Sequence, residues 1–111
     1  MSLIEQIIPN PELRTPEVTK FVEEALDCCI LHARKNHDYG NAFYKAMKDL
    51  GQSYAVGKLF DKMQRLIALC GKEETSEVVD ESYEDTLRDM ACYAIMTIVY
   101  RQYVKSKTVE V

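Results

Sequence analysis

The sequence is poor in the residues that interrupt helices. Only four glycines and three prolines occur in 111 residues, and two of the prolines lie within the first eleven positions. Because glycine and proline destabilise helix interiors, their scarcity allows long helices from Phe21 onward. The sequence also lacks a P-loop, a glycine-rich dinucleotide turn and a nucleophile elbow. These absences exclude the common loop-based nucleotide sites and the serine hydrolase elbow.

The four cysteines lack the spacing of a metal site or a redox motif. Cys28 and Cys29 are adjacent, so they face different sides of a helix, and Cys70 and Cys92 stand alone. All four lie among apolar residues, and no CxxC pair occurs. We therefore expect buried thiols in a reducing compartment rather than disulfides or a zinc site.

The chain also lacks an excess of positive charge and a long apolar run. Its 14 basic and 18 acidic residues give a net charge of −4, which argues against direct binding of duplex nucleic acid. The longest apolar run covers residues 90–100, whereas a bilayer crossing needs about 20 residues. The first residues do not resemble a signal peptide. We expect a cytoplasmic protein with no membrane partner.

Helical periodicity dominates the rest of the sequence. Apolar residues recur at three- and four-residue spacing in segments that we expect to be helices over residues 16–40, 53–70 and 82–103, with a short helix over 41–50. The apolar stripes that we expect to be buried include Phe21 in the first of these helices, and Met63, Ile67 and Cys70 in the helix over 53–70. Thr15 and Ser53 are suitable N-caps, and Gly51 and Gly71 are suitable helix ends. The prediction is an all-α bundle of three long helices and one short helix. It forms a single domain over residues 15–105, with an irregular arm over 1–14 and a tail over 106–111.

The last predicted helix is apolar nearly all round from residue 90 onward. A helix with this pattern is buried on every side. Because a chain of 111 residues has only a modest core, we expect a homodimer or a higher homo-oligomer, with a central helix in a monomer as the alternative.

Two polar segments lie at the ends of predicted helices. Residues 35–40 (KNHDYG) end the first long helix, and residues 84–89 (EDTLRD) open the last one. If consecutive helices run antiparallel, one end of the bundle gathers four carboxylates, those of Asp38, Glu81, Asp85 and Asp89. Carboxylates crowded in this way repel one another unless a cation neutralises them, and Mg²⁺ prefers oxygen ligands. The sequence therefore predicts an Mg²⁺ site with these four residues as ligands.

Other polar residues are predicted to lie near the same end. Lys35, Lys62 and Arg65 are candidates to bind phosphate, and Tyr39 to stack on a base. A carboxylate that binds no metal is a candidate general base. Simpler explanations remain for the acids. Glu84 and Asp85 suit the positive end of a helix, Arg88 can pair with Glu84 on the surface, and Asp38 favours a turn.

Together the motifs resemble one known family. Residues 35–40, Asp61-Lys62 with Arg65, and Glu81 followed by residues 84–91 (EDTLRDMA) resemble the nucleotide modification associated domain family, type 1. The resemblance covers about residues 20–100. That family is common in phages and prophages, and it is similar to the MazG-type all-α nucleoside triphosphate pyrophosphatases. The resemblance implies a MazG-like oligomer, from a bacterial or phage-infected host cell, that binds a nucleotide.

The resemblance also implies roles for individual residues. MazG-type enzymes use two acidic motifs to bind Mg²⁺ and cut a nucleotide between its α and β phosphates. Asp85 and Asp89 match the second motif, and Asn36 and Tyr39 would meet the sugar or base. The first motif, Glu-x-x-Glu, has no clean match, since the nearest residues are Glu23, Glu24 and Asp27. Either Asp38 takes the metal role, with Asp38 and Asp85 as catalytic residues, or the activity is altered or lost.

Three functions remain open at this point. The first is an Mg²⁺-dependent pyrophosphohydrolase that acts on a (deoxy)nucleoside triphosphate or a modified nucleotide. The second is a non-catalytic nucleotide-binding or accessory module for phage nucleotide or DNA modification. The third is a helical interaction protein whose acidic residues are only surface charge.

Overall fold

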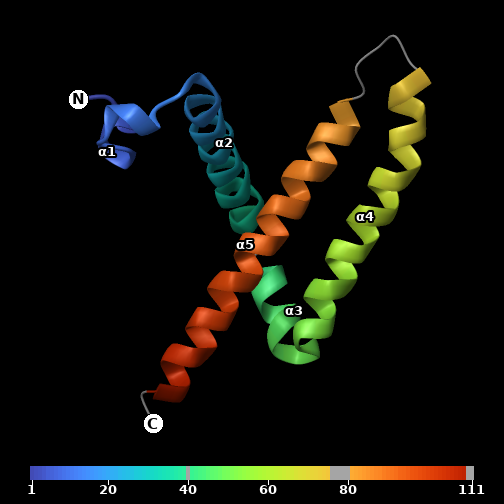
Figure 1. Ribbon diagram of the computed structural model, residues 1–111. Coiled ribbons are helices and arrows are strands. Elements are labelled where there is room, and N and C mark those ends of the chain that lie inside the picture. The colour runs from blue at the N-terminus through green and yellow to red at the C-terminus, as the bar shows by residue number, and fades with distance from the viewer. Residues whose placement is uncertain (40, 76–80, 110–111) are drawn as a thin grey trace. The chain divides into compact units, whose positions relative to one another are not determined.

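The computed structural model describes residues 1–39, 41–75 and 81–109, with the side chains of 39, 72–75, 81–82 and 107–109 excepted. Every regular element in these residues is helical, as predicted. The elements are α1 (Leu3–Ile7), the 3₁₀ turn η1 (Pro11–Leu13), α2 (Pro16–Tyr39), α3 (Ala42–Leu50), α4 (Gln52–Thr75) and α5 (Glu81–Val109) (Figure 1). The chain divides into two compact units, Met1–Lys35 and Asn36–Val111. None of the described helices combines the length and hydropathy that a bilayer crossing requires.

The first unit contains α1, η1 and most of α2. The arm predicted as irregular holds a short helix and a 3₁₀ turn, which Ser2 and Asn10 cap by accepting backbone N–H groups. Thr15 caps α2 as predicted, since its Oγ1 accepts a hydrogen bond from the backbone N–H of Val18 at 3.2 Å. Capping by short polar side chains thus explains how two short helical segments and the start of α2 follow one another within the first sixteen residues.

Two residues with positive φ delimit α3. Gly51 ends the helix as predicted, with φ of +77° and its N–H bonded to the carbonyl of Met47 at 2.8 Å. At the start, Asn41 has a left-handed conformation with φ of 62°. Gly40, the last residue of the first long helix as predicted, lies outside the described residues. Asparagine tolerates the left-handed region better than most residues, so Asn41 can form this turn.

Other predicted boundaries were wrong by a few residues. Ser53 lies inside α4 rather than capping it, and its hydroxyl donates a hydrogen bond to the carbonyl of Leu50. Gly71 does not end α4, which continues to Thr75. α5 continues to Val109, into the residues predicted as a tail. A single glycine costs a helix only about 1 kcal/mol, so the flanking residues carry α4 through position 71.

The core of the second unit lies where α3 meets α4 and α5. Met47 is fully buried, and Phe43 and Ala55 are nearly so. The ring of Phe43 lies 5.7 Å, centroid to centroid, from each of Tyr44, Tyr54 and Tyr93. Further along the α4–α5 pair, Leu66 and Thr86 are buried. This core therefore fixes α3 at one end of the pair and leaves the other end to α4 and α5.

Several residues predicted to be buried are exposed. Phe21 on α2 and Met63, Ile67 and Cys70 on α4 are exposed, although the periodicity placed them on apolar stripes. Cys29 is exposed as well, while Cys28 is buried, and all four cysteines are reduced thiols. The predicted all-round burial of the last helix is also absent from the single chain, since Ile95, Ile98 and Val99 are exposed. α4 and α5 thus have more apolar surface than the chain itself covers in its second unit.

Candidate functional site

An ion pair joins α4 to α5 within the second unit. Nζ of Lys62 lies 3.2 Å from Oδ2 of Asp89, and the two side chains are 26% and 24% exposed. Charged groups that have lost most of their contact with water need a partner of opposite sign. Lys62 and Asp89 thus satisfy one another between two helices that are far apart in sequence.

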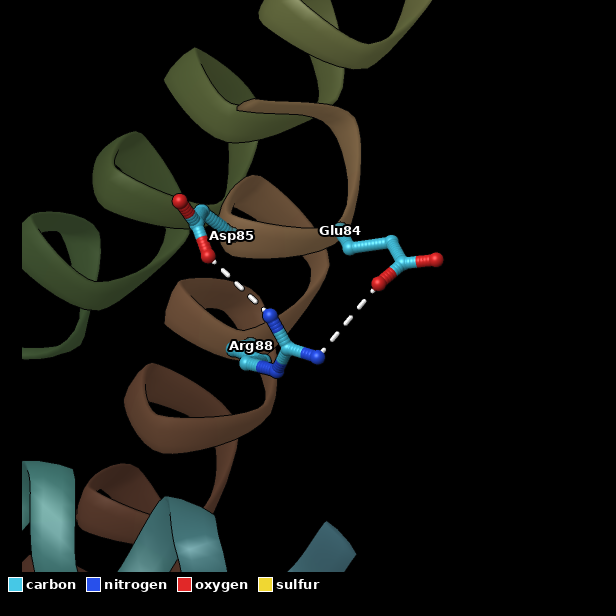
Figure 2. A network of polar contacts seen from close by, with 3 residues as sticks. All are labelled: Glu84, Asp85 and Arg88. Atoms are coloured by element: carbon cyan, nitrogen blue, oxygen red, sulfur yellow. Dashed lines mark hydrogen bonds and ion pairs between the residues drawn. The ribbon is translucent and has the colours of Figure 1, made fainter. Parts of the chain in front are cut away.

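Arg88, the residue before Asp89 on α5, contacts two carboxylates that lie about one turn earlier on the same helix. Its Nη1 donates to Oδ1 of Asp85 at 3.0 Å, and its Nη2 donates to Oε2 of Glu84 at 3.4 Å (Figure 2). These are the i,i+3 and i,i+4 contacts that a helix surface allows. The side chains of Glu84 and Asp85 are 59% and 67% exposed, so both remain accessible to solvent. The Arg88–Glu84 pair considered from the sequence is confirmed.

These residues form one polar cluster, which we call the α4–α5 cluster: Lys62, Glu84, Asp85, Arg88 and Asp89. Asp85 and Asp89 lie one turn apart on the same side of α5, as their spacing predicted. Thr86, between them in sequence, is buried and so faces another side of the helix. The cluster contains three carboxylates and two cations, and each of the three carboxylates contacts a cation.

The structure does not bring Asp38 to this cluster. Asn36 donates a hydrogen bond from its side-chain amide to Asn41, which lines a cavity together with Tyr100 and Tyr103. Tyr100 is fifteen residues beyond Asp85 on α5, which corresponds to about 22 Å at 1.5 Å per residue. Asp38 is only three residues from Asn41, so it lies near this second region rather than near Asp85.

The length of α3 explains this difference. The predicted convergence required each helix to return the chain to the end of the bundle where the previous one began. α3 has nine residues and α4 has 24, which correspond to rises of about 13 Å and 36 Å. α3 therefore covers only part of α4, and its first residue stays beside the C-terminal half of α5.

The remaining predicted residues are distributed as follows. Arg65 is exposed on α4, and Lys35 is exposed on α2 in the first unit. Glu23, Glu24 and Asp27 are also exposed on α2. The side chains of Tyr39 and Glu81 lie outside the described part of the chain. Of the predicted site residues, the described structure thus brings together Lys62, Asp85 and Asp89.

The metal prediction has limited geometric support. Among the described side chains, no group of three or more His, Cys, Asp or Glu residues gathers closely enough to hold a metal ion. Asp85 and Asp89 remain as two carboxylates on one helical face. From the sequence, Arg88 was considered only as a surface partner of Glu84. The three-residue spacing of Arg88 from Asp85 was the signal that could have placed Arg88 in the site.

Comparison with protein families identifies the family of the region that contains the cluster. The model of the family "nucleotide modification associated domain 1" matches residues 35–100. The chain belongs to this family. The matched region of this nucleotide modification associated domain contains α3, α4 and the α5 residues of the cluster. No curated protein and no solved structure matches the chain.

Proposed function

We propose that this nucleotide modification associated domain binds the phosphate groups of a nucleotide at the α4–α5 cluster, together with Mg²⁺. The observation that carries the proposal is the Lys62–Asp89 pair across two helices, beside the Asp85–Arg88 pair on α5. The family description supports a role connected with nucleotides. In its full form the proposal is an Mg²⁺-dependent pyrophosphohydrolase that acts on a (deoxy)nucleoside triphosphate or a modified nucleotide.

The donor set fits Mg²⁺. This ion is commonly held by one or two carboxylates, and water and phosphate oxygens complete its coordination. Asp85 and Asp89 are two carboxylates one helical turn apart, and Asp85 is well exposed. When bound, Mg²⁺ would polarise the phosphoryl group and lower the pKa of a coordinated water.

The two cations of the cluster are proposed to bind the phosphate groups. Lys62 and Arg88 now neutralise the two carboxylates that would hold the metal. Once those carboxylates bind a cation, the ammonium and guanidinium groups become available for phosphate oxygens. Arg88 can form two parallel hydrogen bonds with a phosphate, and Lys62 acts as a point charge. The chain would thereby exchange internal ion pairs for contacts with the metal and the nucleotide.

The decisive experiment measures pyrophosphate release. Purified protein is incubated with Mg²⁺ and a panel of ribo- and deoxynucleoside triphosphates. We expect release of pyrophosphate, which Asp85→Asn and Asp89→Asn remove while the helix content is unchanged. Asp49→Asn is the matched control because Asp49 is exposed on α3 and outside the cluster. Absence of pyrophosphate across the panel, with folded protein, would exclude the hydrolase form.

A second function is favoured by the same contacts. The three carboxylates of the cluster already contact cations, and no third metal-ligating group joins Asp85 and Asp89 among the described side chains. This arrangement suits a non-catalytic nucleotide-binding or accessory module. A nucleotide would then raise the melting temperature through preferential binding to the folded state, without hydrolysis. If a nucleotide at saturating concentration does not raise the melting temperature, this alternative is excluded as well.

We also propose that the protein self-associates as a homodimer or a higher homo-oligomer. On α4, Val56, Phe60, Met63 and Ile67 are between 46% and 64% exposed. Their spacing of four, three and four residues is that of a coiled-coil seam, in which the partner is another helix. On α5, Leu87, Ile95 and Ile98 are exposed apolar side chains as well. Large exposed apolar surface of this kind marks a protein–protein interaction site.

A further inference from the structure

A cavity of about 590 Å³ lies at the other end of the second unit. It is formed between α3 and the C-terminal half of α5, about 22 Å along α5 from the polar cluster. This volume falls within the range of small-molecule sites. Part of its lining, Tyr103 and Val104, lies beyond the residues that the family model matches.

The walls of the cavity are aromatic and apolar. Tyr44 contributes from α3, and Tyr100 and Tyr103 contribute from α5, with valine side chains between them. The ring of Tyr44 is held edge to face against Phe43, with centroids 5.7 Å apart and an interplanar angle of 90°. Tyrosine rings held in this way offer flat faces for stacking on a planar ring.

The cavity also carries local positive charge on an acidic protein. Lys45 and Lys48 line it from α3, three residues apart and therefore on the same side of that helix. Neither lysine forms an ion pair with a carboxylate of the described residues, in contrast to Lys62, and no acidic residue lines the cavity. These two ammonium groups are thus placed to neutralise an anion at the edge of the aromatic walls.

Two further contacts suit an anionic, ring-bearing ligand. Asn41 lines the cavity and accepts the hydrogen bond of Asn36 with its side-chain carbonyl, which leaves its NH₂ group as a donor. The hydroxyl of Tyr44 is neutral at physiological pH, and burial raises its pKa further, so this group can donate to an anion rather than repel it.

We propose that this cavity binds a nucleoside monophosphate, with its base against the tyrosine rings and its phosphate against Lys45 and Lys48. The cavity supplies two features that this ligand requires, a stacking surface and paired cations. None of the described residues that line it has a carboxylate for a divalent metal. Binding at this cavity is therefore independent of Mg²⁺ and of the α4–α5 cluster.

The test uses the full chain and isothermal titration calorimetry in the presence of EDTA, which keeps divalent metal out of the other site. The probes are AMP, dAMP, GMP and dGMP, with adenosine and inorganic phosphate as partial ligands. We expect a monophosphate to bind more tightly than either partial ligand, with an affinity that falls as salt is raised. The double variant Lys45→Ala/Lys48→Ala should weaken binding at least about tenfold.

Three variants separate this proposal from its rivals. Tyr103→Ala should weaken both the monophosphate and adenosine, and because Tyr103 is exposed the helix content should not change. Lys20→Ala, on the exposed surface of α2, is the charge control and should bind as the wild type does. Asp85→Asn/Asp89→Asn should also bind normally, which distinguishes this site from the cluster.

Other outcomes overturn the proposal. Wild-type protein that binds no monophosphate, or binding that the lysine double variant leaves intact, would exclude the site. Loss of binding in Asp85→Asn/Asp89→Asn would move the ligand to the cluster. If Tyr103→Ala instead changes the molar mass in light scattering with no effect on ligand, the cavity is a seam between two copies.

Discussion

Lys62 on α4 and Asp89 on α5 form an ion pair with 3.2 Å between Nζ and Oδ2, and each side chain is about one quarter exposed. The pair fixes the register of α4 and α5 at the end of these two helices that α3 does not contact. The same two residues would separate if a metal and a phosphate entered the cluster. The strength of the Lys62–Asp89 ion pair is therefore relevant both to the stability of the protein and to the proposed function.

The first prediction concerns the stability of this pair. Lys62→Met keeps the aliphatic stem and removes the charge, which leaves Asp89 without this partner. We expect a loss of about 1 kcal/mol in the free energy of unfolding, since both partners are mostly withdrawn from water. A double-mutant cycle with Asp89→Asn, followed by urea denaturation, should give a coupling of about 0.5–1 kcal/mol. A coupling near zero would show that the pair does not fix the helices.

The second prediction separates binding from stability at Arg88. Its contacts with Glu84 and Asp85 lie within one helix and are solvent-accessible, so Arg88→Gln should lower stability by no more than about 0.5 kcal/mol. If Arg88 binds phosphate, the same change should weaken Mg²⁺-nucleotide binding about tenfold or more. Calorimetry measures the affinity, and Arg34→Gln on α2 is the matched control. Unchanged affinity would remove Arg88 from the site.

The third prediction contrasts two glycines. Gly51 has φ of +77°, so Gly51→Ala should cost about 1 kcal/mol through backbone strain, although nothing lies within 4 Å of the added Cβ. Gly57 lies inside α4 with the same open space, and Gly57→Ala should stabilise the protein by about 0.5–1 kcal/mol. Thermal and urea unfolding of both variants check the pair. Equal effects of the same sign would mean that the turn at Gly51 does not need a positive φ.

Local signals in the sequence predicted the helices well. Thr15 and Gly51 act through hydrogen bonds within a few residues, so their roles can be read without the rest of the chain. The prediction that Gly71 ends its helix was wrong, because a glycine marks a helix end only when the residues after it do not favour the helix. The Arg88–Glu84 contact was also predictable, since four-residue spacing on a helix determines it.

The sequence predicted less well which residues far apart in the chain lie close together, and several predicted site residues were therefore misplaced. Asp38 and Asp85 were expected to meet because consecutive helices were assumed to run antiparallel between the same two ends of the bundle, whereas α3 has only nine residues and α4 has 24. The cavity beside Tyr44 was missed for the same reason, since only packing brings α3 against Tyr100 and Tyr103. Which side of α4 faces α5 also depends on packing, so Met63 and Ile67 were expected to be buried although they are exposed in the single chain.

The fourth prediction concerns alkaline pH. Burial raises the pKa of Tyr44 above the ordinary tyrosine value of about 10, so the folded protein retains this proton at a pH where the unfolded chain loses it. The resulting stability is complete below pH 10 and is lost as the pH rises through the folded-state pKa. Urea midpoints should therefore fall as the pH rises above about 10, and Tyr44→Phe should reduce that fall. An identical slope in Tyr44→Phe would show that other groups cause the alkaline loss.

The fifth prediction tests the apolar stripe of α4. If Val56, Phe60, Met63 and Ile67 pack against a second copy, light scattering should give the mass of a dimer or a higher oligomer at micromolar concentration. Phe60→Asp would place a charge in that seam, and the cost of burying it should shift the protein to monomer. Ala68→Asp adds the same charge at an exposed position outside the stripe, so it should leave the mass unchanged. A monomeric wild type would show that this surface is not a self-association interface, while equal dissociation by both variants would trace the effect to net charge rather than to the stripe.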